Sequence, residues 1–212
     1  MLRDKGYNGT PYWTMVANPI ASFFSTSSLS EMRYIASIDW IFLLVMFGMT
    51  WWAFGLEIAL LMACLILTNY AAFHGTLKSA FMRLDWVASL VATTCLLKKG
   101  YYRTAGVAAS ISVVSRVFPA AFLFGIAAYA VWFWLREKRL HRQSVQFFVA
   151  FSGAVSLLLI LSLLYTGTNY WESFIAKIAQ HRGELGAWRV GLKYVFLFGG
   201  VRVTLGRGPA FK

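Results

Sequence analysis

The sequence predicts an all-α, polytopic integral membrane protein. Of its 212 residues, 59% are hydrophobic and only 13% are charged, whereas a soluble domain has about 45–50% apolar and about 25% charged residues. The apolar residues are also gathered in long runs with short polar loops between them, which is the pattern of a chain that crosses a bilayer several times.

About six membrane-spanning helices are expected, two of them short. They occupy residues 34–53, 56–73, 85–99, 104–116, 119–135 and 146–165. Residues 1–33 are expected to form an extracytoplasmic or interfacial lead-in, residues 34–166 the transmembrane domain, and residues 167–212 an extracytoplasmic amphipathic helix and tail. The amphipathic helix is predicted over residues 171–181, because apolar side chains recur there at helical spacing.

Residues 101–135 form one apolar stretch that is too long for a single crossing. As one helix it would be roughly 50 Å long, against a hydrocarbon core of about 30 Å. It contains the sequence Ser115-Arg116-Val117-Phe118-Pro119, in which the proline ends or kinks a helix and the arginine is costly at mid-bilayer. We therefore predict two helices joined by a turn at Arg116–Pro119.

The positive charge predicts the orientation in the membrane. The net charge is +12, and two basic clusters lie in short loops, at residues 98–103 and 136–142. The predicted turn puts both clusters on one side, which is then cytoplasmic, with both chain termini extracytoplasmic. Anionic lipid headgroups account for the excess of charge, so membrane lipids rather than nucleic acid are the expected partners.

Two acidic residues are candidates for catalysis. Asp39 and Asp85 each precede a tryptophan near the start of a predicted membrane helix. One interpretation is structural, since an acid is favoured at a helix N-terminus and tryptophan at the membrane interface. The other is a catalytic or cation-binding role. The two cysteines, Cys64 and Cys95, lie in apolar runs without a CxxC or Cys/His pattern, so neither a metal site nor a cofactor is expected.

Cations at the predicted outer ends of the helices are candidates for binding a lipid phosphate. Arg116 is the principal one, because broken helices at membrane depth usually line a cavity; Lys78, Arg83 and His74 are expected to assist it. The alternatives are an arginine that reaches from a turn to the interface, and a histidine that only makes interfacial hydrogen bonds.

Three short motifs resemble the polytopic GT-C type glycosyltransferases, and most closely glycosyltransferase family 87 and its uncharacterised bacterial relatives. The motifs are the small-residue run 105–122 with its Arg116 and Pro119, the residues 67–70 followed by 81–86, and the residues 171–181 followed by 189–192. The resemblance implies a polyprenyl-phosphate sugar donor and sugar transfer on the extracytoplasmic face, most simply of a bacterial inner membrane.

This chain departs from that family in two respects. Family members have more helices, and their catalytic acid typically lies in a first extracytoplasmic loop for which this chain has no counterpart. Three expectations therefore stay open: an active enzyme, a truncated or inactive form, and a non-catalytic structural subunit of a larger membrane protein complex.

Overall fold

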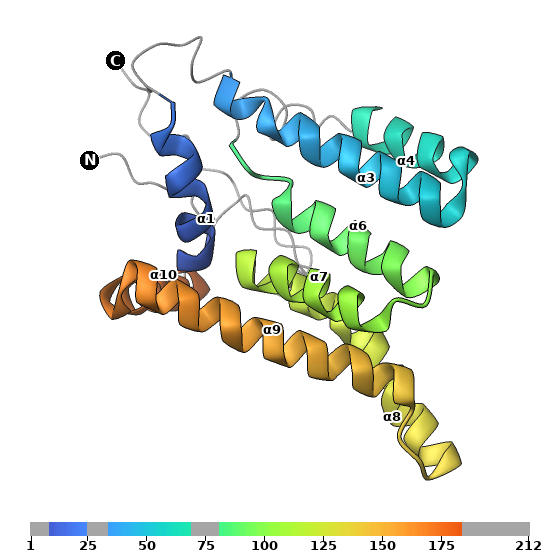
Figure 1. The fold of residues 1–212 in the computed structure, drawn as a ribbon. Helices are drawn as coiled ribbons and strands as arrows, with labels where there is room; N and C mark the ends of the chain where they lie inside the picture. Colours follow the sequence, from blue (N-terminus) through green and yellow to red (C-terminus); the bar gives the residue numbers. More distant parts are fainter. Residues whose placement is uncertain (1–8, 25–33, 69–80, 184–212) are drawn as a thin grey trace, which may run out of the picture. The chain divides into compact units, whose positions relative to one another are not determined.

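The computed structural model describes residues 9–24, 34–68 and 81–183, and every regular element in these residues is a helix (Figure 1). The elements are α1 (Pro11–Ser22), α3 (Ile38–Phe54), α4 (Leu56–Thr68), α6 (Asp85–Lys98), α7 (Tyr102–Ser115), the 3₁₀ helix η2 (Phe118–Phe122), α8 (Leu123–Glu137), α9 (Arg142–Thr166) and α10 (Thr168–Gly183). The prediction of an all-α fold is confirmed for these residues. The chain divides into two compact units, Met1–Phe174 and Ile175–Lys212, and the contacts described below lie within the first.

Among the described residues, three helical segments are long and apolar enough to cross a membrane: Tyr34–Phe54, Phe118–Glu137 and Arg142–Thr166. In their most apolar windows only 22%, 6% and 11% of the residues, respectively, are buried inside the protein, so most of their apolar side chains face outward, as in a helix surrounded by lipid. Leu56–Thr68 is apolar but shorter, and α6 and α7 have 14 residues each. The predicted count of about six spans is thus not confirmed.

The predicted break at Arg116–Pro119 is confirmed. Helix α7 ends at Ser115, and Arg116 is extended, with φ −142° and ψ 129°. Pro119 then lies in the first turn of η2, where the missing proline N–H leaves no intrahelical hydrogen bond unmade. The second helix differs from the prediction in one detail: it begins with this 3₁₀ turn, and α-helix starts only at Leu123.

Helix α9 begins at Arg142, four residues before the predicted start at residue 146. The cause is local capping. The ring nitrogen Nδ1 of His141 accepts a hydrogen bond from the backbone N–H of Ser144 (3.4 Å), which satisfies one of the free donors of the first turn. The helix ends at Thr166 and is followed by Gly167, whose φ of 78° is readily adopted by glycine. The predicted amphipathic helix follows directly as α10.

Helix α7 lies at the centre of the packing, with α9 and α6 as its main neighbours (Figure 1). Helix α3 packs on α6 and α4, and α1 on α9 and α7. Ala105 and Ala109 of α7 are buried against Phe147 of α9. At Gly106 the two backbones are so close that an added Cβ would lie 2.4 Å from the carbonyl oxygen of Phe147. Small residues on α7 therefore allow this close approach.

Candidate functional site

The starts of α1 and α6 and the end of α7 are joined by hydrogen bonds. The Thr10 hydroxyl, which precedes α1, donates to the carbonyl oxygen of Val114 in the last turn of α7. The indole Nε1 of Trp13 donates to the carbonyl oxygen of Met82, three residues before α6 (3.0 Å). This junction brings together a group of polar residues that we call the Asp85 cluster. Its members are Tyr12, Asp39, Arg83, Asp85, Ser115 and Arg116.

Asp39 attaches the start of α3 to the segment that leads into α6. Its side chain is only 1% exposed. The carboxylate oxygen Oδ1 accepts hydrogen bonds from the backbone N–H groups of Arg83 (3.0 Å) and Leu84 (3.2 Å). The acid lies in the first turn of α3, as predicted, but it binds the backbone of a different segment. A charge-assisted bond to buried backbone donors is a strong structural contact.

Asp85 is the first residue of α6 and is 8% exposed. One carboxylate oxygen, Oδ2, accepts a hydrogen bond from the hydroxyl of Ser115. The other, Oδ1, is buried and has no side-chain donor in the described part of the chain; the backbone N–H groups of Asp85 and Trp86 are the donors closest to the carboxylate. Most buried carboxylate oxygens have a hydrogen-bond partner, so this oxygen can still accept a bond from a further hydroxyl.

Two arginines place positive charge at the cluster. The half-buried Arg116 attracts Asp85 electrostatically, and the exposed Arg83 attracts Asp39. Asp39 and Asp85 also repel each other. The structure thus brings together four of the six residues predicted as site residues: Asp39, Asp85, Arg83 and Arg116. The other two, Lys78 and His74, lie outside the described residues.

Two members of the cluster had not been predicted from the sequence. Ser115 is the last residue of α7, and its position next to Arg116 in a motif was the only signal for it. Tyr12 lies in the first turn of α1. Burial raises the pKa of the Tyr12 hydroxyl, and the nearby Asp85 carboxylate raises it further. Nothing in the sequence around Tyr12 indicated that it would lie near an acid 73 residues away.

The cluster combines two buried carboxylates with two arginine cations. A buried carboxylate can take a proton from a hydroxyl group. An arginine guanidinium group can donate two parallel, charge-assisted hydrogen bonds to the oxygens of a phosphate. Within the ranges that the structure describes, no group of three or more His, Cys, Asp or Glu side chains is placed to hold a metal ion.

Comparisons with protein-family models, curated proteins and solved structures find no match for this chain. The class that the fold and the cluster define is a helical protein with membrane-length apolar helices and a buried acid–arginine site.

Proposed function

We propose that the chain is a GT-C-like membrane glycosyltransferase, or a truncated or inactive form of one. It would use a polyprenyl-phosphate sugar on the extracytoplasmic face of a bacterial inner membrane. The observation that carries the proposal is the buried Asp85 carboxylate, whose Oδ1 has no side-chain donor in the described chain and which lies near Arg116. The sequence resemblance supports the class of reaction.

Five residues of the cluster have distinct roles in this reaction. Asp85 removes the proton of the acceptor hydroxyl while the acceptor oxygen bonds to the anomeric carbon of the sugar. The bond from that carbon to the phosphate oxygen breaks, and the lipid phosphate leaves with the bonding electrons. Arg116 and Arg83 bind this phosphate and stabilise its growing charge. Ser115 orients Asp85, and Asp39 positions the backbone of Arg83.

Sugar transfer by the detergent-purified chain tests the proposal. Asp85→Asn keeps an oxygen that accepts the Ser115 hydrogen bond but has no basic carboxylate, so turnover should fall about 100-fold or more. Arg116→Ala should weaken binding of the lipid phosphate. Glu57→Gln is the control, because Glu57 is an exposed acid in the first turn of another helix. No turnover, together with unchanged lipid-phosphate binding by Arg116→Ala, would exclude the enzyme.

A non-catalytic subunit of a larger membrane complex is the second candidate. The observation that favours it is that Asp39 and Asp85 both hold elements together: Asp39 bonds backbone groups of residues 83 and 84, and Asp85 bonds Ser115. A subunit of this kind should co-purify with the same partner proteins in mild detergent from independent preparations. A monodisperse chain without partners would count against it.

A further inference from the structure

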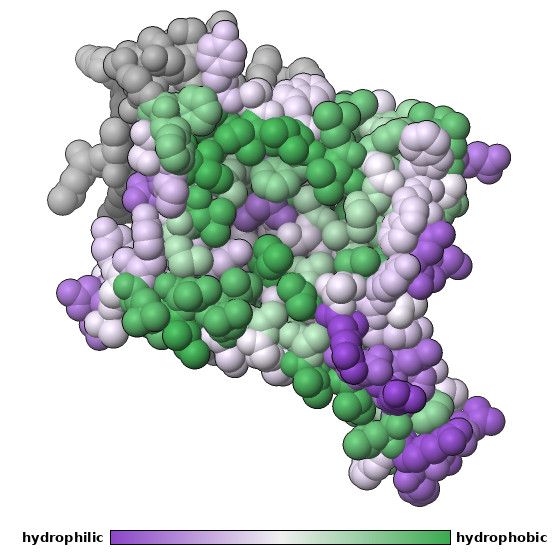
Figure 2. Space-filling view, viewed as in Figure 1, coloured by the Kyte–Doolittle hydropathy of each residue, from purple (hydrophilic) through white to green (hydrophobic). Residues whose placement is uncertain are grey.

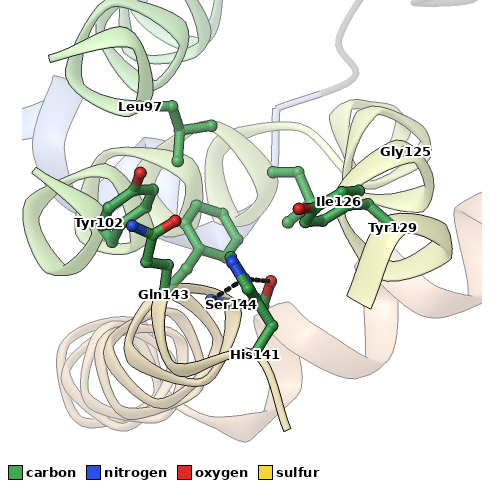
Figure 3. A pocket seen from close by; sticks show the side chains of 9 residues that line it. Leu97, Tyr102, Gly125, Ile126, Tyr129, His141, Gln143 and Ser144 are labelled. Atoms are coloured by element: carbon green, nitrogen blue, oxygen red, sulfur yellow. Dashed lines mark hydrogen bonds between the residues drawn. The ribbon is translucent and has the colours of Figure 1, made fainter. Parts of the chain in front are cut away.

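A cavity of about 340 Å³ lies at the opposite end of α6 and α7 from the Asp85 cluster. Asp85 and Leu97 are 12 residues apart on α6, which corresponds to about 18 Å along the helix axis. The lining residues come from four helices and the residue before α9. They are Leu97, Tyr102, Gly125, Ile126, Tyr129, His141, Gln143, Ser144 and Phe147 (Figure 3).

The interior of this cavity is mainly apolar, and its polar side chains are Tyr102, Tyr129 and three residues at the start of α9. Leu97 and Ile126 face the space from different helices, while His141, Gln143 and Ser144 lie together along one edge (Figure 3). His141 is fixed there by its bond to Ser144 and by edge-on contact with the ring of Tyr129, at 5.3 Å between centroids. The volume lies in the range of ligand pockets, roughly 300–1,000 Å³.

On three separate segments, a basic residue directly follows a cavity-lining residue in the sequence. Lys98 follows Leu97, Arg103 follows Tyr102, and Arg142 follows His141. All three are exposed. Figure 2 shows hydrophilic residues gathered beside apolar surface where α8 ends and α9 begins.

Further arginine side chains lie over aromatic rings at this end of the protein. The guanidinium of Arg136 lies 5.4 Å from the centre of the Trp132 ring, and that of Arg139 lies 5.8 Å from the centre of the Phe133 ring. Glu137 is the single acid between residues 98 and 142, and it pairs with Arg139 at 3.9 Å. The local charge is therefore strongly positive.

We infer that this cavity binds an anionic phospholipid, with part of an acyl chain inside and the phosphate on Lys98, Arg103 and Arg142. An anionic phospholipid combines an apolar acyl chain and a negatively charged headgroup in one molecule. The apolar helices of this protein would place the cavity beside the lipids of the bilayer. Basic residues at a membrane surface attract such headgroups. The site is independent of the proposed transferase reaction.

The test measures binding of phosphatidylglycerol to the full chain in mixed micelles, with phosphatidylcholine and inorganic phosphate as competitors. Gly125 lines the cavity, and a Cβ there meets nothing within 4 Å, so Gly125→Leu places a side chain in the lipid's volume. Gly153→Leu is the matched control, since Gly153 is also helical and open but does not line the cavity. Gly125→Leu should weaken phosphatidylglycerol binding about tenfold or more, and the control should not.

A second pair of variants tests the charge without changing the packing. Arg142→Gln should weaken binding, whereas Arg139→Gln should change it less, because Arg139 pairs with Glu137 and is not adjacent to a lining residue. This pair decides the question if Gly125→Leu does not fold. Equal effects within both pairs, or equally effective competition by phosphatidylcholine or inorganic phosphate, would overturn the inference.

Discussion

The hydroxyl of Ser115 donates a hydrogen bond to the carboxylate of Asp85, so the last residue of α7 holds the first residue of α6. Both side chains are buried. A second bond, from the Ser112 hydroxyl to the carbonyl oxygen of Trp86 (2.8 Å), joins the same two helices one turn away. The two short helices are therefore fixed to each other at the end where the candidate site lies.

Ser115→Ala should destabilise the protein by about 2 kcal/mol, because a buried carboxylate loses a charge-assisted hydrogen bond. Unfolding in detergent monitored by circular dichroism measures the loss. Ser110→Ala is the control: Ser110 is equally buried, but its hydroxyl bonds only the carbonyl oxygen of Val107 in the same helix. That variant should change the free energy of unfolding by less than about 1 kcal/mol. Equal losses would show that Asp85 does not depend on Ser115.

Asp39→Ala should destabilise the protein by more than about 2 kcal/mol, because it leaves the backbone N–H groups of Arg83 and Leu84 without their acceptor. Asp39→Asn should lose less, since an amide oxygen can accept one of these bonds. The same unfolding measurement compares them, with the exposed Glu57→Gln as reference. A catalytic Asp39 would give the opposite result: stable variants with no activity.

Gly106→Ala should destabilise the contact between α7 and α9 by about 1–3 kcal/mol, because its Cβ would lie 2.4 Å from a backbone oxygen. Gly153→Ala on α9 should be neutral or stabilising, since its Cβ meets nothing within 4 Å and alanine is favoured over glycine in a helix. Thermal unfolding of the two variants separates the effects. A stable Gly106→Ala protein would mean that the helices are further apart than described.

Labelling of single cysteines in intact cells tests the proposed orientation. In a background without Cys64 and Cys95, Arg139→Cys should be protected from a membrane-impermeant maleimide, and Phe23→Cys should react. Both positions are well exposed on the protein, at 73% for the Arg139 side chain and 86% for Phe23. Both should react once the membrane is permeabilised. Reaction of Arg139→Cys in intact cells would place the basic loops on the outside.

Local signals along the chain predicted most helix boundaries. The start of α6 at Asp85 and the break after Ser115 both agree with the sequence, because an acid, an arginine and a proline act on the backbone within one turn. The start of α9 was missed, since a histidine cap has no strong sequence signature. The close approach at Gly106 is likewise a tertiary contact, which local patterns do not contain.

The candidate site was predictable as a set of residue types but not as an arrangement. Aspartates at helix starts and an arginine at a helix break were visible in the sequence. Which backbone groups Asp39 binds, and that Tyr12 and Ser115 lie near Asp85, depends on how α1, α3, α6 and α7 meet. A single sequence does not contain that information, because the contacts join residues far apart in the chain.

The shortness of α6 has a consequence for the surrounding lipid. Its 14 residues extend about 21 Å, whereas a hydrocarbon core is about 30 Å thick. If α6 crosses the membrane as the sequence predicts, with its basic end at one boundary, Asp85 would lie about 9 Å below the other. The bilayer would then have to become thinner there, or water would have to enter from outside. In that geometry, this protein would create a local depression in the membrane, through which a lipid headgroup could reach a buried carboxylate.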